Sequence, residues 1–267
     1  MIFHSSFEYS YLWLPLIGFV IGTLASLIGS GGSFFFLLTL LLLFNVSAPV
    51  AVTTSLASTL PIGIIGTAGH YRHGHINFSF GAIFIITGIL GALLGANLTG
   101  LLAPEKLKTV FGTYIILLAL HMLFNYWKSK KRKNIVHHYP GTNTGGKKTA
   151  KGSVYGFLAG IITGTFGTSE AAPVLAGLLS MKIPVKQVAG TSLAIILMNT
   201  LFALTAHFVV GKIDLMLVYF LAAGATVGAF SGPKVLAGFK TGGAEDSLRL
   251  WYAIVLVIFG IVMLFSK

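Results

Sequence analysis

Apolar runs recur along almost the whole chain, and they restrict its fold more than any other feature. A helix needs about 20 apolar residues to cross the ~30 Å hydrocarbon core of a bilayer. Charged residues make up only 9% of the chain, too few to cover a water-facing surface of this size. We therefore predict an all-α integral membrane protein rather than a soluble enzyme. The runs cover residues 11–28, 34–44, 50–69, 78–102, 109–127, 153–166, 171–181, 188–210, 215–237 and 250–265.

The net charge of +12 comes mostly from one stretch of the chain. Eight of the 18 Lys and Arg residues lie between Lys128 and Lys151, where no Asp or Glu occurs. A basic excess can attract nucleic acid, but a basic stretch between apolar runs is typical of a cytoplasmic loop. We expect the lipid bilayer and no nucleic acid as partner. The absence of cysteine excludes disulfides and thiolate metal sites.

Four short motifs occur twice in the same order, at offsets of 137 or 138 residues, which indicates a tandem duplication. We predict a first transmembrane repeat over 1–127, a basic linker over 128–151 and a second repeat over 152–267. The matching motifs are Gly18-Phe19-x-x-Gly22 with Gly156-Phe157-x-x-Gly160, Thr54-Ser55-Leu56-Ala57 with Thr191-Ser192-Leu193-Ala194, His70-x-x-x-Gly74-x-Ile76-Asn77 with His207-x-x-x-Gly211-x-Ile213-Asp214, and Gly91-Ala92-x-x-Gly95 with Gly228-Ala229-x-x-Gly232.

The direction of the two repeats depends on the interrupted segment 11–44. If it crosses the membrane once, the repeats are parallel; if it enters and returns, each repeat has three net crossings and the two are inverted. Lys and Arg favour the cytoplasmic side, and the inverted arrangement places fourteen inside and four outside, against eleven and seven. We predict inverted repeats, each with three full transmembrane helices and a broken or re-entrant pair, about 8–10 helical segments in all. The 128–151 loop is then cytoplasmic, and both termini lie outside.

Each repeat begins with an apolar segment that small residues interrupt. The breaks are Gly29-Ser30-Gly31-Gly32-Ser33 and Gly167-Thr168-Ser169-Glu170. A helix that starts at a break offers unpaired N–H groups and about half a positive charge, and transporters with inverted repeats bind substrate at such breaks near the midplane. The alternative is that these glycines only permit tight helix packing.

Hydroxyl side chains follow each break at matching positions. Thr54 and Ser55 in the first repeat correspond to Thr191 and Ser192 in the second, and we expect them to donate to a bound substrate. The alternative is that they bond a carbonyl of their own helix. Further polar groups in the same apolar segments are Thr53, Ser58, Asn199 and Thr200.

Three ionisable residues in the apolar segments are candidates for coupling or gating. Glu170 is an intramembrane carboxylate, which is costly and suggests function; it is interpreted either as a proton site or as a helix cap. His70 and His207 occupy equivalent helix ends, where each could sense pH or bond a carbonyl of the adjoining turn.

The sequence carries no pattern of an enzyme or of a metal site. No nucleotide-binding loop, nucleophile elbow or paired carboxylates occur. His70, His73 and His75 lie beside Arg72 and have no neighbouring carboxylate, which argues against a metal. We predict a protein without cofactor that is not an enzyme.

The motifs together resemble the TauE/SafE family of sulfite and organosulfonate exporters. The resemblance rests on Gly29-x-Gly31-Gly32, the two Thr-Ser-Leu-Ala runs and the two His-x-x-x-Gly elements, and it covers the chain outside the 128–151 linker. It implies a carrier of small sulfur-containing anions in the cell (inner) membrane. The family usually has glycines where this chain has Ser169, Glu170 and Ala171, a departure that concerns substrate choice and coupling.

These observations predict a secondary anion transporter that works by alternating access. The expected substrates are sulfoacetate, other C2 sulfonates or sulfite. An anion channel, or a scaffold that delivers sulfur compounds to a partner enzyme, is the alternative, and a homodimer is an open alternative to a monomer. The predicted substrate-binding residues are Ser30, Gly31, Gly32, Ser33, Thr54, Ser55, Thr168, Ser169, Glu170, Thr191 and Ser192.

Overall fold

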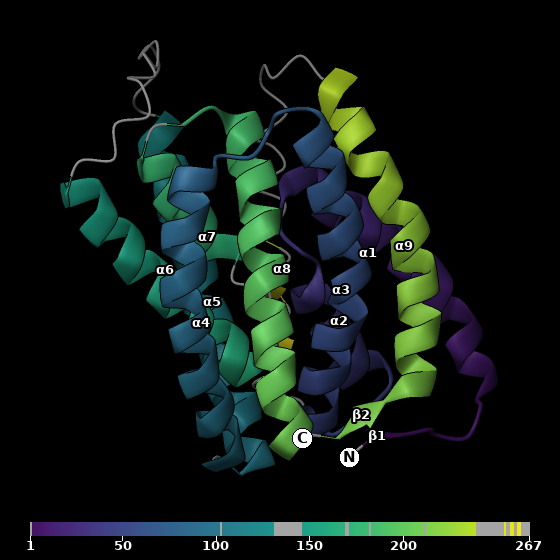
Figure 1. Ribbon diagram of the computed structural model, residues 1–267. Helices are drawn as coiled ribbons and strands as arrows, with labels where there is room; N and C mark the ends of the chain where they lie inside the picture. Colours follow the sequence, from purple (N-terminus) through teal and green to yellow (C-terminus); the bar gives the residue numbers. More distant parts are fainter. Residues whose placement is uncertain are drawn as a thin grey trace. The chain divides into compact units, whose positions relative to one another are not determined.

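The computed structural model is almost entirely helical (Figure 1). It describes residues 2–101, 103–130, 146–168, 171–181, 183–210 and 212–238, together with residues 254, 257, 258, 261 and 262. The elements are β1 (Ile2–Phe3), a 3-10 helix η1 (Tyr9–Trp13), α1 (Leu14–Ile28), α2 (Ser33–Leu38), a π-helical continuation η2 (Thr39–Leu43), α3 (Ala48–Arg72), α4 (Phe78–Leu101), α5 (Pro104–Lys130), α6 (Gly146–Phe166), α7 (Ala171–Ser180), α8 (Val185–Val210), β2 (Ile213–Asp214) and α9 (Leu215–Gly238).

Within the described residues, four helices are long and apolar enough to cross a membrane. They are Tyr9–Leu27, Ala48–Arg72, Phe78–Thr99 and Lys186–His207, and shorter apolar helices cover Ser33–Leu43 and Leu215–Ser231. These helices confirm the prediction of an all-α, multi-pass membrane protein.

The first broken segment leaves one end of the helix bundle and returns to it. Gly29 ends α1 in the left-handed conformation, with φ of 80°, and its N–H donates to the carbonyl of Ala25 at 2.9 Å. Gly31 and Gly32 also have positive φ, a conformation that only glycine adopts without strain, so the chain turns sharply over 29–32, here named the first tip. The rings of Tyr11 and Phe44 lie 5.8 Å apart, so the start and the end of this segment lie together.

The second repeat has the corresponding break. Gly167 follows α6 with φ of 62°, and its N–H donates to the carbonyl of Thr163 at 2.8 Å. Gly167 and Thr168 are here named the second tip. Ser169 and Glu170 lie outside the described residues, and α7 begins at Ala171.

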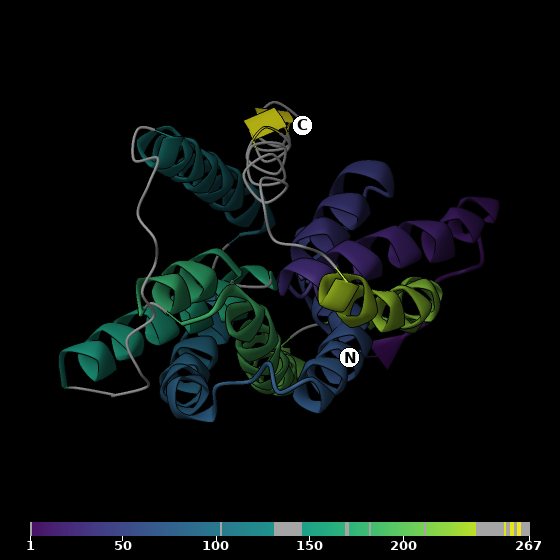
Figure 2. The same ribbon diagram turned by 90° about the horizontal axis from the view of Figure 1, so that it is seen from above.

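Helices α1 and α6, which end at the two breaks and are here named the broken helices, each pack against a helix of the other repeat. Helix α6 lies along α4, and α1 lies along α9, on opposite sides of the central helices α3 and α8 (Figures 1 and 2). A Cβ added at Gly91 or Gly95 of α4 would collide with the carbonyl of Phe157 or Ile161, four residues later on α6. The two helices therefore run parallel, with backbone against backbone, because glycine lets them approach closely.

The α1–α9 pair repeats this contact at equivalent positions. A Cβ at Gly228 of α9 would collide with the carbonyl of Phe19, and one at Gly224 with that of Pro15. Gly228 corresponds to Gly91 in the duplication, and Phe19 corresponds to Phe157. The duplicated glycine motifs thus form two equivalent seams, α4–α6 and α1–α9.

Helices α3 and α8 are repeat partners and run antiparallel. The nearest atoms to a Cβ added at Gly63 belong to Leu197, and the nearest to one at Gly66 belong to Leu193. A later residue of α3 therefore faces an earlier residue of α8. The end of α3 therefore lies beside the start of α8.

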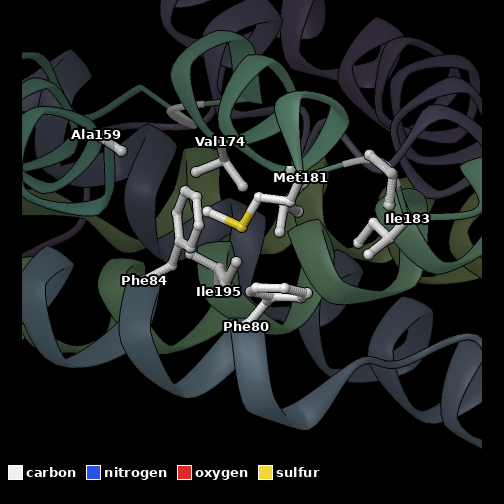
Figure 3. Close-up of a cluster of buried hydrophobic side chains, with 9 residues drawn as sticks. Phe80, Phe84, Ala159, Val174, Met181, Ile183 and Ile195 are labelled. Carbon is white, nitrogen blue, oxygen red and sulfur yellow. The ribbon is translucent and has the colours of Figure 1, made fainter. Parts of the chain in front are cut away.

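Aromatic and aliphatic side chains hold α7 in place against α4, α6 and α8 (Figure 3). Phe80 and Phe84 of α4 are fully buried, as is Ile195 of α8. They face Val174 and Met181, which belong to α7 and the turn after it. The side of α7 toward these helices is therefore an apolar core.

A short parallel pairing joins the N-terminal residues to the corner between α8 and α9. Ile2 pairs with Ile213, and Phe3 pairs with Asp214. The N–H of Ser5 donates to Oδ1 of Asp214 at 3.3 Å. Residues 2–5 thus lie at the end of the molecule where α8 ends.

The chain forms two compact units whose limits differ from the repeat boundaries. One unit consists of Met1–Leu101 and Tyr139–Gly238, and the other of Leu102–His138 and Phe239–Lys267. Both tips, both seams and the α3–α8 pair belong to the first unit. Helices α5 and α6 extend into the predicted 128–151 linker, to Lys130 and from Gly146, because apolar patterning alone does not define helix ends; residues 131–145 lie outside the described residues.

Candidate functional site

The two tips lie against the first turns of α8 and α3. A Cβ added at Gly29 would come within 2.6 Å of the Ala189 carbonyl oxygen on α8. One added at Gly167 would come within 2.5 Å of the Val52 carbonyl oxygen on α3. Glycine is therefore required at both positions for two reasons. It permits the left-handed turn, and it permits close contact with the backbone of the other repeat.

A serine of the other repeat bonds the carbonyl of each tip glycine. Ser192 Oγ on α8 donates to the Gly29 carbonyl at 2.7 Å. Ser55 Oγ on α3 donates to the Gly167 carbonyl at 2.9 Å and also lies 2.8 Å from the Val52 carbonyl. Both serines are fully buried. A serine has one hydroxyl proton, so in this conformation both protons are already used by protein carbonyls.

The neighbouring threonines bond the corners that precede α4 and α9. The N–H of Asn77 donates to Thr191 Oγ1 at 2.8 Å, and the N–H of Asp214 donates to Thr54 Oγ1 at 3.2 Å. Asn77 in turn caps α4, since its Oδ1 accepts from the Phe80 N–H at 3.2 Å. Each Thr-Ser pair therefore holds the tip and the corner of the opposite repeat.

Only some of the hydroxyls in α3 follow the alternative of bonding their own helix. Thr59 Oγ1 donates to the Ser55 carbonyl at 2.8 Å. Thr53 Oγ1 lies 3.2 Å from the Pro49 carbonyl and also contacts the Lys212 carbonyl of the second repeat. Sequence patterns could not separate these cases, because the partners lie more than 100 residues away.

The two predicted gating histidines occupy equivalent buried positions. His70 Nε2 lies 3.2 Å from the Ser26 carbonyl near the end of α1, and His207 Nε2 lies 2.7 Å from the Gly164 carbonyl near the end of α6. A carbonyl oxygen only accepts, so each Nε2 carries a proton. Each ring thus bonds a carbonyl, although that carbonyl belongs to a broken helix rather than to the adjoining turn.

His70 has two histidine neighbours, whereas no histidine contact of His207 is found among the described residues. His70 Nδ1 lies 3.3 Å from His75 Nδ1, and the rings of His73 and His75 stack at 5.7 Å. Burial lowers the pKa of His75, and the charges of His73 and Lys186 lower it further. Among the residues that the structure describes, no group of three or more His, Cys, Asp or Glu side chains is placed to hold a metal.

Six buried residues have a hydroxyl without a hydrogen-bond partner among the described residues. Ser33, Ser58, Thr163 and Thr200 are fully buried, Thr168 of the second tip is 1% exposed, and Thr165 just before it is 5% exposed. An unpaired buried hydroxyl costs about 1–3 kcal/mol. Such groups are therefore candidates for contact with a ligand.

Three of these hydroxyls lie near the middle of the α3–α8 pair. Thr200 is one turn from Leu197, the residue that faces Gly63. Ser58 is one turn before Ile62 on the same face of α3, and Ile62 packs against Gly32 at the first tip. Ser33 follows Gly32 directly and begins α2, which packs against α3.

The structure places the remaining predicted site residues as follows. Ser30, Gly31 and Gly32 form the first tip and are buried. Ser169 and Glu170 lie outside the described residues. Sequence reasoning placed Ser33 and Thr168 in the site but left out Ser58 and Thr200, whose equivalents are Ile195 and Gly63, so the duplication gave no signal for them.

The side chain of Asn199 on α8 faces a glycine of α4. A Cβ added at Gly88 of α4 would meet the Asn199 side-chain amide, with its Oδ1 at 2.6 Å. Asn199 is fully buried. It therefore fills the space left by a glycine in α4, on the side of α8 toward the α4–α6 seam.

Comparisons with known proteins identify the family of the chain. The family model "Sulfite exporter TauE/SafE" matches residues 14–263. Among curated proteins, "probable membrane transporter protein YdhB" of Bacillus subtilis is 27% identical and aligns over 82% of this chain and 87% of its own length. YunE of the same organism, also named a probable membrane transporter protein, is 25% identical over 96% of this chain and 98% of its own length.

An archaeal relative extends the similarity beyond bacteria. The protein MJ0441 of Methanocaldococcus jannaschii, named a probable membrane transporter protein, is 27% identical over 78% of this chain and 76% of its own length. No solved structure matches the chain significantly. The family match and these names indicate a membrane transporter rather than an enzyme, and the chain thus belongs to the TauE/SafE sulfite exporter family.

Proposed function

We propose that this protein is a secondary transporter that exports small sulfur-containing anions such as sulfoacetate, other C2 sulfonates or sulfite. The observation that carries the proposal is the group of buried, unpaired hydroxyls of Ser33, Ser58 and Thr200 near the middle of α3 and α8. Hydroxyls and backbone N–H groups suit the diffuse negative charge of a sulfonate, because no single oxygen carries the full charge.

We further propose that the two repeats are inverted and alternate access to this site. Three features of the helix arrangement support the inversion. Helices α3 and α8 run antiparallel, the segment 11–44 returns to the end where it starts, and the α4–α6 and α1–α9 seams are equivalent. A pseudo-two-fold axis in the membrane plane relates such repeats in many transporters. Movement of one tip against the other would then open the site to either side.

The same arrangement supports the proposed orientation in the cell membrane. Arg72 ends α3 beside the start of α8, where Lys186 lies, and Lys212 follows the end of α8. Lys and Arg favour the cytoplasmic side. The end with Arg72 and Lys186 is therefore proposed to be cytoplasmic together with the 128–151 loop, and the termini to be outside.

Flux through the purified protein tests the function. In proteoliposomes we expect saturable counterflow of radiolabelled sulfite or sulfoacetate, with competition by other sulfonates and none by neutral solutes of similar size. A panel that also contains taurine, thiosulfate, sulfate and small carboxylates measures the selectivity. Ion conductance without saturation would instead identify an anion channel, and the absence of any flux or binding would contradict the proposal.

Single cysteines test the orientation, since the chain has no cysteine of its own. Arg72→Cys and Lys212→Cys each place one thiol at an exposed residue outside the buried core. A membrane-impermeant maleimide added to intact cells is expected to label the Lys212→Cys variant and to label Arg72→Cys only after lysis. The cysteine-free chain is the control. Labelling of both variants from the same side would rule out inverted repeats.

A further inference from the structure

We propose that Ser55 and Ser192 are positioning residues that form two reciprocal clasps, each of which holds the tip of the opposite repeat closed. Ser192 of the second repeat holds the first tip, and Ser55 of the first repeat holds the second tip. The two bonds join residues 163 and 112 positions apart in the sequence. The proposal depends on these contacts, and only its consequence for transport rests on the proposed function.

The two clasps share their bond to a tip glycine, although Ser55 Oγ also lies 2.8 Å from the Val52 carbonyl of its own helix. Ser55 and Ser192 are related by the duplication, as are Gly167 and Gly29. Each serine donates to the carbonyl of a glycine with positive φ, at 2.9 Å and 2.7 Å. Contacts that recur in both halves of a duplicated chain are not accidents of local packing.

A left-handed glycine explains why the tip needs a clasp. At Gly29 and Gly167 the backbone leaves the helical path, so the carbonyl of the glycine cannot bond an N–H further along the same helix. Both glycines are buried, where an unpaired carbonyl is costly. The serine hydroxyl supplies the donor, and the bond pulls the tip against Ala189 or Val52.

The two clasps lie far enough apart to open one at a time. The first tip and Ser192 lie near the start of α8, while the second tip and Ser55 lie near the start of α3. Because α3 and α8 are antiparallel, these are opposite ends of the helix pair. About 11 residues of α3 separate Ser55 from Gly66, which faces Leu193 beside Ser192, a distance of roughly 16 Å at the rise of an α-helix. One clasp can therefore open while the other stays closed.

Reporter thiols at the two tips test the clasps separately. Ser30→Cys reports on the first tip and Thr168→Cys on the second; these equivalent positions are 4% and 1% exposed. The rate of reaction with a soluble maleimide is measured for each reporter in detergent micelles. We expect Ser192→Ala to raise the rate at position 30 about tenfold and to leave position 168 unchanged, and Ser55→Ala to do the reverse, since a net hydrogen bond is worth about this factor.

Two further variants separate a clasp from general loosening. Thr59→Val removes a buried hydroxyl that bonds its own helix and is expected to change neither rate. Ser55→Thr keeps the hydroxyl and is expected to retain slow labelling at position 168. Faster labelling of both tips in either alanine variant, unchanged labelling of both, or fast labelling in Ser55→Thr would overturn the proposal. Labelling is independent of flux, so the clasps can be verified even if no sulfonate transport is found.

Discussion

Gly160→Ala is expected to lower the free energy of unfolding by about 3 kcal/mol, because the new methyl group has no space in the α4–α6 seam. Its Cβ would overlap the carbonyl oxygen of Gly88, and the nearest other atoms are also backbone, of Gly88 and Ala92. A flexible side chain could move aside, but the backbone of a packed helix cannot. Gly224→Ala is expected to have a similar effect in the α1–α9 seam, where the obstacle is the carbonyl of Pro15.

The seams are sensitive because membrane helices gain little from hydrophobic burial against each other. Close van der Waals packing between small residues supplies much of their association energy. Loss of close approach along one seam weakens the contact of a whole broken helix with the other repeat. The two seams share no residues, so the effects of the two substitutions are expected to add in the double variant.

Thermal or denaturant unfolding of the purified protein in detergent measures these effects. Gly81→Ala is the matched control, since it also replaces a glycine of α4, but its Cβ would meet only a Thr191 methyl group at 3.4 Å. We expect this control to unfold like the unmodified protein. Equal stability of Gly160→Ala and Gly81→Ala would show that the helices are not in backbone contact.

Ser58→Ala and Ser33→Ala are each expected to weaken sulfonate binding by about ten- to a hundredfold, because a hydrogen bond to a charged group is worth about 1.5–3 kcal/mol. Both hydroxyls are fully buried and lack a partner among the described residues. Binding to the purified protein is measured by calorimetry or by ligand-dependent thermal shift, and the Michaelis constant for counterflow is measured in proteoliposomes.

The stability of the ligand-free protein separates a binding role from a structural one. Removal of a bonded hydroxyl lowers stability, whereas removal of an unpaired buried hydroxyl removes a desolvation cost. Ser58→Ala is therefore expected to leave the ligand-free melting temperature unchanged or to raise it. Thr59→Val, next to Ser58 but bonded to its own helix, is expected to leave the affinity unchanged. An unaltered affinity in both serine variants would remove Ser33 and Ser58 from the site.

The two kinds of glycine show which inferences the sequence supports. The glycines at 29, 31, 32 and 167 interrupt apolar runs, and the expected breaks occur there, because a left-handed turn is a local property of glycine. The seam glycines, such as Gly91 and Gly160, were visible only as repeated motifs. Their partners lie on a helix of the other repeat, so no local pattern identifies them.

The Thr-Ser runs show the same limit at the candidate site. Their duplication marks Thr54, Ser55, Thr191 and Ser192 as candidates for substrate contact, which stays a prediction. Residue type could not tell whether such a hydroxyl faces a substrate or a carbonyl of the opposite repeat. The structure pairs Ser55 and Ser192 with tip carbonyls. It also identifies Ser58 and Thr200 as buried hydroxyls without a partner among the described residues, and neither has a hydroxyl counterpart in the duplication.

The sequence by itself determined the membrane class, the duplication and the positions of the breaks, because hydropathy, repetition and backbone freedom are properties of short segments. The tertiary structure alone decided how the repeats interlock. Helix α1 packs on α9, and α6 on α4, while each Thr-Ser pair bonds a tip and a corner of the opposite repeat. Those contacts join residues up to 209 positions apart, as in the approach of Gly224 to Pro15. They are selected by backbone approach and buried hydrogen bonding, which exist only once the helices are packed.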